Sequence, residues 1–186
     1  MLAQDRLVTL TGTGGVGKTR LAMRVAADVL HDYRDGAWLV ELAALREPDL
    51  VAQSAVAALG LKEQPGLSLV ETLTGSLQAR RLLLVLDNAE HLLGACAGLA
   101  DALLRRCPDI TLLVTSREPL GVPGERTYRV PSLSMPDPQR DATAASLSAT
   151  ESARLFADRV RLHSPHFAIT DRNAAAIASL CRRLDG

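Results

Sequence analysis

The residues with the clearest chemistry form a glycine-rich octapeptide near the amino terminus, GTGGVGKT at residues 12–19. Its first six residues match the dinucleotide-binding pattern G-x-G-x-x-G, and all eight match the mononucleotide-binding pattern G-x-x-x-x-G-K-[ST]. Both patterns describe a loop that follows a strand, opens a helix and presents backbone N–H groups to phosphate oxygens. The octapeptide therefore indicates phosphate binding and leaves two kinds of nucleotide open.

Two residues, Lys18 and Thr19, favour the mononucleotide pattern. In such a loop the lysine neutralises charge on the β- and γ-phosphates, and the threonine hydroxyl is a ligand of Mg²⁺. Lys18 and Lys62 are the two lysines among 21 basic residues, so a lysine here indicates a need for a compact ammonium rather than a guanidinium. The predicted nucleotide-binding residues are Gly12, Thr13, Gly14, Gly15, Val16, Gly17, Lys18, Thr19 and Arg20.

An acidic residue near the end of the second predicted strand keeps the dinucleotide interpretation open. A dinucleotide site needs a carboxylate there to bind a ribose, and Glu41 lies within the apolar segment 37–42. The alternative function is therefore an NAD-type dinucleotide-binding domain. A third hypothesis is a protein interaction module that no longer binds nucleotide and uses the helices after Thr150 as a contact surface.

Asp87 is the predicted second protein ligand of Mg²⁺. It ends the most apolar stretch of the chain, residues 82–87, and a continuous apolar strand is typical of the middle of a sheet covered on both faces. A carboxylate at the carboxyl end of such a strand can reach a metal ion beside the phosphate loop. The competing role is to cap the next helix, for which Asn88 is the better candidate.

Composition limits the classes of function. The chain has 186 residues and no formal net charge, so no overall field draws it to nucleic acid or to a membrane surface. Aromatic residues make up 3%, which argues against a surface that stacks single-stranded bases. No apolar run could span a bilayer and no signal peptide is visible, so we expect a cytoplasmic protein without a membrane partner. The three cysteines, without C-x-x-C spacing, are expected to be buried or half-buried free thiols.

Strands and helices alternate over most of the chain, which is typical of a parallel α/β sheet with right-handed crossovers. The predicted strands are 6–11, 37–42, 82–87, 110–115 and 127–130, and the predicted helices are 18–30, 50–59, 68–79, 89–106, 151–162 and 171–184. We predict a nucleotide-binding domain over residues 1–131, a linker over 132–150, and the first helices of a helical subdomain over 151–186. The helix from residue 151 carries both acidic and basic residues, so we expect no direct DNA binding by this segment.

Four segments together resemble STAND-class P-loop NTPases of the NB-ARC type, in particular the ATPase segment of large bacterial transcriptional regulators. They are LVTLTGTGGVGKTRLA, RLLLVLDNAEHLL, LLVTSREPLGVPGE and ESARLFADRV, in the order of that family. The resemblance implies a three-layer sandwich with a five-stranded parallel sheet in the order 5-1-4-3-2, followed by a helical subdomain. It also implies a switch in which ADP holds a closed monomer, ATP permits an open form that self-associates, and hydrolysis resets the protein.

The same resemblance assigns roles to residues outside the phosphate loop. Arg117 matches the family's sensor arginine, which reads the γ-phosphate; its alternative role is a surface ion pair with Glu118. Many relatives carry a second acid directly after the Mg²⁺ aspartate, where this chain has Asn88, a poor base. Glu90 is the nearest carboxylate that could orient the attacking water. Because residue 88 is not an acid, we predict slow ATP hydrolysis.

Two segments usual in that family fall outside the sequence. They are a Gly-Arg-Glu-like segment before the first strand, which contacts the adenine, and a Gly-Leu-Pro-Leu-like segment after residues 182–186. We therefore expect a fragment of a larger regulator or a truncated gene product. If the regulator binds DNA, we expect a domain outside this chain to do so.

Overall fold

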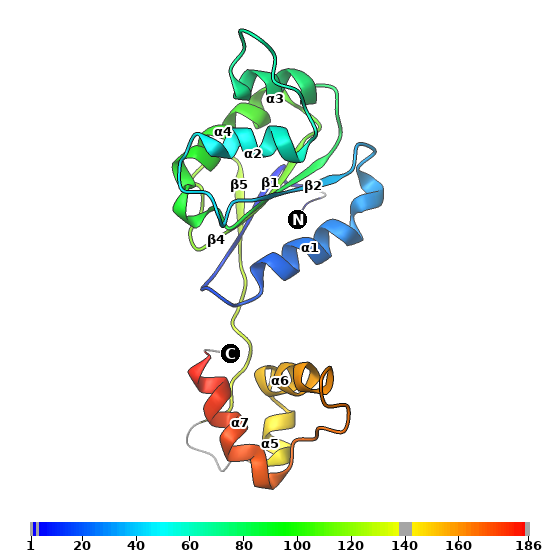
Figure 1. The fold of residues 1–186 in the computed structure, drawn as a ribbon, viewed down its shortest axis with the longest axis vertical. Coiled ribbons are helices and arrows are strands. Elements are labelled where there is room, and N and C mark those ends of the chain that lie inside the picture. Colours follow the sequence, from blue (N-terminus) through cyan, green and yellow to red (C-terminus); the bar gives the residue numbers. More distant parts are fainter. Residues whose placement is uncertain (1, 3, 138–142, 185–186) are drawn as a thin grey trace. The chain divides into compact units, whose positions relative to one another are not determined.

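A five-stranded parallel sheet forms the centre of the amino-terminal part of the chain (Figure 1). The computed structural model describes residue 2, residues 4–137 and residues 143–184. The strands are β1 (Leu7–Thr11), β2 (Ala37–Glu41), β3 (Leu83–Asp87), β4 (Thr111–Ser116) and β5 (Glu125–Arg129). Their order is β2-β3-β4-β1-β5, which confirms the predicted order. As a result, β4 lies between the strand that leads into the phosphate loop and the strand that ends in Asp87.

Helices cover both faces of this sheet, which explains why β3 is apolar up to its final aspartate. Leu84 and Leu86 of β3 pack into one core, whereas Leu83 and Val85 pack into the other, because successive side chains of a strand point to opposite faces. The first core contains α2, α3 and α4, and the second contains α1 (Figure 1). These helices are α1 (Lys18–Asp28), α2 (Leu50–Ala58), α3 (Leu69–Leu77) and α4 (Leu93–Arg106).

The carboxyl end of α4 is held by Arg6, which directly precedes β1. The Arg6 guanidinium donates hydrogen bonds to the carbonyl oxygens of Leu104 (3.0 Å), Ile110 (3.3 Å) and Cys107. The last carbonyls of a helix lack intrahelical partners and carry partial negative charge. Arg6 therefore satisfies these groups and ties α4 and the turn into β4 to the first strand.

The segment after Asp87 departs from the predicted single helix over residues 89–106. The structure has a 3₁₀ helix, η2 (Ala89–His91), and then α4 from Leu93. Leu92 separates them with a non-helical backbone (φ −130°, ψ 30°), and its side chain is buried in the core. The helical spacing of apolar residues continued across this break, so the pattern did not reveal it.

Strand β5 begins at Glu125, two residues before the predicted start. Its side chains are mostly exposed, and it pairs with β1 from Leu7 opposite Glu125 to Thr11 opposite Arg129. Pairing with β1 therefore makes a strand from polar residues that a hydrophobic pattern does not identify.

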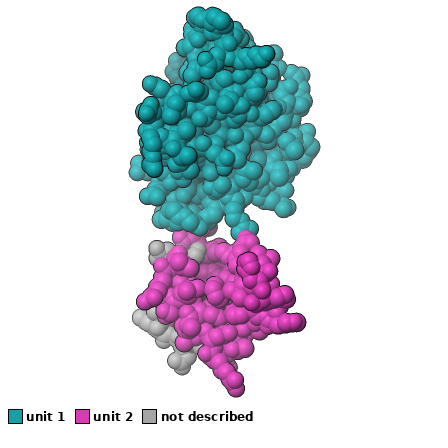
Figure 2. Space-filling view, viewed as in Figure 1, with its two compact units in different colours: residues 1–130 teal, residues 131–186 magenta. Residues whose placement is uncertain are grey.

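Residues 131–186 form a second compact unit, separate from residues 1–130 (Figure 2). Its helices are α5 (Ala144–Ser148), α6 (Glu151–Arg161) and α7 (Asp171–Arg183). The range predicted to be a linker thus contains a helix: Thr143 caps α5 by accepting a hydrogen bond from the Ser146 N–H, and Leu147 is fully buried. At five residues, α5 is too short to show a helical period. Residues 138–142 of that range lie outside the described residues.

The cysteines agree with the sequence-based expectation. Cys96, Cys107 and Cys181 are all buried and free, and burial raises the pKa of the Cys96 thiol from 9.0 to about 11. Within the described ranges, no helix combines the length and apolar character needed to cross a membrane.

Candidate nucleotide-binding site

The glycine-rich loop joins the carboxyl end of β1 to the first turn of α1. Gly12 (φ 150°), Gly15 (φ 82°) and Gly17 (φ 91°) have positive φ angles, which glycine adopts without the steric cost of a Cβ. A Cβ on Gly12 would lie 3.1 Å from the Val130 carbonyl oxygen and 3.2 Å from Val16 Cγ1. Gly17 begins α1 without a side-chain cap, so the first N–H groups of the helix are left for an anion.

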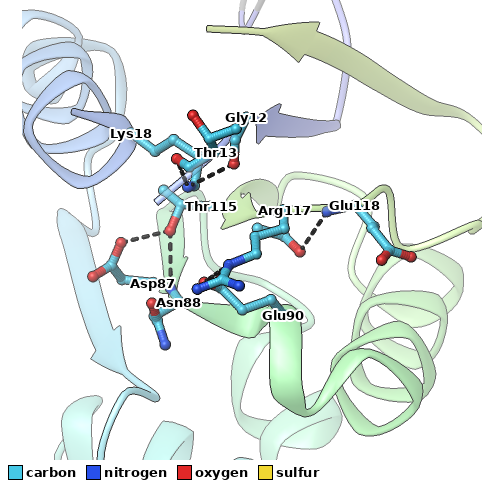
Figure 3. Close-up of polar contacts among 10 residues, drawn as sticks. Gly12, Thr13, Lys18, Asp87, Asn88, Glu90, Thr115, Arg117 and Glu118 are labelled. Carbon is cyan, nitrogen blue, oxygen red and sulfur yellow. Dashed lines mark hydrogen bonds and ion pairs between the residues drawn. The ribbon is translucent and has the colours of Figure 1, made fainter. Parts of the chain in front are cut away.

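Lys18 lies beneath this loop and is 8% exposed. Its Nζ donates hydrogen bonds to the carbonyl oxygens of Gly12 and Thr13, each at 2.9 Å (Figure 3). An ammonium group has three N–H donors, so one donor remains for a phosphate oxygen. The two carbonyl contacts hold the positive charge against the loop.

Thr19 and Asp87 meet although 68 residues separate them in sequence. The Thr19 hydroxyl donates a hydrogen bond to Asp87 Oδ1 at 2.8 Å. Among the described residues no group of three or more His, Cys, Asp or Glu side chains is placed to hold a metal ion. Mg²⁺ commonly binds one or two protein oxygens together with phosphate and water rather than an all-protein cage. The hydroxyl and the carboxylate therefore fit Mg²⁺ next to the phosphate loop.

Thr115, at the carboxyl end of β4, also contacts Asp87 and was not predicted from the sequence. Its hydroxyl donates to Asp87 Oδ1 at 2.6 Å and accepts a hydrogen bond from the Asn88 N–H at 2.8 Å (Figure 3). The available signal was the strand order, because a residue at the end of β4 must lie between the loop and Asp87.

Arg117 and Glu90 form an ion pair beside the loop, with 3.2 Å between Arg117 Nε and Glu90 Oε1 (Figure 3). The alternative partner, Glu118, instead donates its backbone N–H to the Ser116 hydroxyl at 3.2 Å. Arg117 Nη2 lies 3.7 Å from the position of a Cβ on Gly14. The guanidinium is therefore close to the loop while its charge is balanced by Glu90.

Asn88 has a left-handed backbone, with φ 65° and ψ 50°. Asparagine tolerates this conformation better than most residues because its short polar side chain can hydrogen-bond locally. The Asn88 side chain makes no capping hydrogen bond to η2, so the predicted capping role is wrong. The left-handed residue instead turns the chain from β3 into η2, which carries Glu90.

The strand order argues against the dinucleotide alternative. Glu41 ends β2 directly opposite Asp87, and β2 is the edge strand furthest along the sheet from β1 on that side. Three inter-strand steps of about 4.8 Å place the ends of β1 and β2 about 14 Å apart. In a dinucleotide fold, the strand that carries the ribose-binding acid lies next to the first strand.

Known proteins resemble this chain in sequence. The AAA domain family matches residues 2–122. A Mycobacterium tuberculosis protein named "Putative HTH-type transcriptional regulator" is 50% identical over 186 residues, which are 100% of this chain and 19% of that protein. The chain thus spans about a fifth of the length of this relative.

Solved structures share the fold at low sequence identity. A chain in the structure of Drosophila ORC bound to DNA has a TM-score of 0.54 at 17% identity, over 98% of this chain and 47% of that chain. A STAND protein with a tetratricopeptide repeat sensor from Pyrococcus horikoshii has a TM-score of 0.51 at 13% identity, over 96% of this chain and 25% of that chain. The family match includes the phosphate loop, Asp87 and Arg117. The chain therefore belongs to the AAA domain family of P-loop NTPases.

Proposed function

We propose that this chain is the ATP- and ADP-binding switch domain of a signal-responsive transcriptional regulator, of the NB-ARC type, with slow ATP hydrolysis. The observation that carries the proposal is the convergence of Lys18, Thr19 and Asp87 at one edge of the sheet. A phosphate-binding ammonium and a hydroxyl–carboxylate pair side by side suit a nucleotide bound together with Mg²⁺.

The loop and its neighbours would share the binding of the phosphates. The N–H groups from Gly14 to Thr19 would bind phosphate oxygens, and Lys18 would add a fixed positive charge. Thr19 and Asp87 would hold Mg²⁺, which would neutralise charge on the phosphate oxygens. Arg20, the last of the predicted nucleotide-binding residues, is exposed on the first turn of α1 and would add positive charge near the phosphate loop.

Arg117 would distinguish ATP from ADP. A guanidinium binds phosphate oxygens through paired N–H donors, and this one lies close to Gly14 of the loop. With ADP bound, Arg117 retains its ion pair with Glu90; with ATP bound, the γ-phosphate competes with that carboxylate. Binding of the γ-phosphate would thus break the Arg117–Glu90 ion pair, and a switch requires such a structural difference between the ATP and ADP states.

Slow hydrolysis follows from the same contacts. Glu90 is the nearest carboxylate that could orient water, and it is paired with Arg117. Asn88 is a neutral amide, so it can position water but not accept its proton at a useful rate. We infer that turnover resets the switch and serves no metabolic purpose.

The regulatory part of the proposal rests on the similarity to the mycobacterial relative, which is named as an HTH-type transcriptional regulator. In a full-length regulator the ATP form would self-associate, and a separate domain would bind DNA. Helix α6 presents Arg154, Arg159 and Arg161 together with Glu151 and Asp158, a mixture that does not favour binding to a phosphate backbone. DNA binding by this segment itself is therefore not part of the proposed function.

A thermal melt with and without nucleotide tests the proposal. A ligand present at a hundred times its Kd stabilises the folded state by about 2.7 kcal/mol, which corresponds to about 5–10 °C for a chain of this size. Mg-ADP and Mg-ATP should each raise the melting temperature of the chain, and Lys18→Ala should abolish both shifts. A folded chain whose melting temperature does not respond to either nucleotide would support the interaction module instead, as would self-association that is indifferent to ATP.

A further inference from the structure

We propose that Thr115 is a positioning residue for Mg²⁺ binding: it holds the Asp87 carboxylate in the orientation that the metal requires. This inference rests on the proposed function. It adds a residue that acts through Asp87 and touches neither nucleotide nor metal itself.

The strand order places Thr115 where such a role is needed. Strand β4 lies between β1 and β3. Thr115 pairs with Leu10 of β1, and the residue before it, Val114, pairs with Leu86 of β3. By alternation, Thr115 and Asp87 share the face of Leu113 and Val85, which is the face covered by α1. Its side chain therefore fills the space between the loop and the acidic strand.

The contacts of the Thr115 hydroxyl use both its hydrogen and its lone pairs. It donates to Asp87 Oδ1 at 2.6 Å and accepts from the Asn88 N–H at 2.8 Å. A hydroxyl can donate one hydrogen bond, and Thr115, 1% exposed, directs that bond to the carboxylate. Hydrogen bonds to a carboxylate are among the stronger ones in proteins.

Asp87 Oδ1 receives two hydroxyl hydrogens, one from Thr19 on α1 and one from Thr115 on β4. Two donors from different elements fix the rotation of the carboxylate about its Cβ–Cγ bond. Within the described part of the chain both bonds end on Oδ1, so Oδ2 is the oxygen left for the cation or for its bound water. Partners of metal ligands commonly contribute 10- to 100-fold to metal affinity in about this way.

Thr19 alone does not provide this orientation, because its side chain is exposed and it is itself a proposed ligand. Thr115 belongs to a fully buried strand in the middle of the sheet. Through the Asn88 N–H it also fixes the left-handed turn that follows Asp87. The aspartate is thus held from both its side chain and the next peptide group.

The test compares Thr115→Val and Thr115→Ser with wild type by titration calorimetry of ADP, in MgCl₂ and in EDTA. Valine has nearly the shape of threonine but cannot donate, so it should reduce the Mg²⁺-dependent gain in ADP affinity by about tenfold or more. Affinity in EDTA should not change, because Thr115 does not contact the phosphates. Serine keeps the hydroxyl and should restore most of the gain.

Thr9→Val is the matched control. Thr9 is a fully buried threonine of the neighbouring strand, and its hydroxyl has no hydrogen-bond partner among the residues that the structure describes. This substitution removes the same atoms from the same sheet, and it should leave the Mg²⁺-dependent gain at the wild-type value.

The outcomes separate this inference from the proposed function. Wild type that binds no ADP contradicts the proposed function. If Mg²⁺ increases the ADP affinity of wild type and increases that of Thr115→Val equally, the inference about Thr115 is overturned. If Thr115→Val does not fold, Thr115→Cys and Thr115→Ser decide: a thiol is a weak donor, so an equal gain in these two variants also overturns it.

Discussion

Glu90 and Arg117 lie on segments that follow different strands, yet their side chains meet with 3.2 Å between Oε1 and Nε. Glu90 is 17% exposed and Arg117 is 64% exposed, so the arginine is the partner that is free to move. Its Nη2 lies 3.7 Å from the Cβ position on Gly14. A small rotation of the arginine side chain can therefore exchange the carboxylate for a phosphate oxygen at the loop.

This relationship predicts opposite effects of two substitutions on nucleotide preference. Glu90→Gln removes the competing charge, so ATP affinity should rise a few-fold while ADP affinity stays unchanged, since an ion pair whose arginine is solvent-exposed contributes about 1 kcal/mol. Arg117→Ala should lower ATP affinity by about tenfold, the loss of a charge-assisted contact, again without changing ADP affinity. Competition titrations of the two nucleotides in Mg²⁺ measure both ratios.

Glu118→Gln is the control for both variants, because Glu118 follows Arg117 directly but its described contact is through its backbone N–H. It should leave the ATP-to-ADP ratio at the wild-type value. Equal losses of ATP and ADP affinity in Arg117→Ala would mean that Arg117 binds a phosphate common to both nucleotides, and that it does not read the third.

Gly12 and Gly14 should differ sharply in their tolerance of alanine. At Gly12 a Cβ would meet a backbone oxygen at 3.1 Å, and φ is 150°, so the loop or Val130 must shift. We expect Gly12→Ala to destabilise the fold by about 1–3 kcal/mol and to weaken nucleotide binding. At Gly14 the nearest atom is the end of the Arg117 side chain at 3.7 Å, an ordinary contact, so Gly14→Ala should keep the wild-type urea midpoint. A Gly12→Ala variant as stable as Gly14→Ala would contradict the strain argument.

Much of the site follows from sequence patterns, because its principal residues sit at ends of regular elements. The glycine spacing places Lys18 and Thr19 at the start of a helix, and the apolar run before Asp87 places that carboxylate at the carboxyl edge of the sheet. Parallel strands have their carboxyl ends at the same edge of the sheet, so the sequence predicts that Thr19 and Asp87 lie close together.

The remaining site geometry depends on features without a periodic signal. Thr115 is a common residue for a strand end, and its role emerges only when β4 is placed between β1 and β3. The Glu90–Arg117 pair depends on the left-handed Asn88 and on the break at Leu92, which redirect the chain within a run of helical spacing. Helix α5 has too few residues to show the spacing of apolar residues that identifies a helix. In each case tertiary contacts decide the local structure.

Arg6 should contribute more to stability than other arginines of this chain. Arg6→Met keeps the aliphatic stem but leaves the carbonyl groups of Leu104, Cys107 and Ile110 without their donor. We expect a loss of about 1–3 kcal/mol, visible as a lower urea midpoint. Arg24→Met removes an exposed ion pair with Asp28 on α1 and should change stability by no more than about 0.5 kcal/mol. Equal midpoints for the two variants would show that solvent replaces Arg6 at the end of α4.

Cys96 should make the fold less stable at alkaline pH. Burial raises the pKa of its thiol from 9.0 to about 11, so between these values the unfolded chain has lost a proton that the folded chain retains. Because the unfolded state then binds fewer protons, the free energy of unfolding falls as pH rises through this window, by at most about 1.4 kcal/mol per pH unit for one group. Below pH 9 the thiol is neutral in both states and has no such effect. Urea unfolding of wild type and Cys96→Ala at several pH values isolates the contribution, since all other groups titrate in both proteins. The wild-type stability should decline more steeply than that of the variant between pH 9 and pH 11, whereas parallel curves would show that the Cys96 thiolate is accommodated in the folded core.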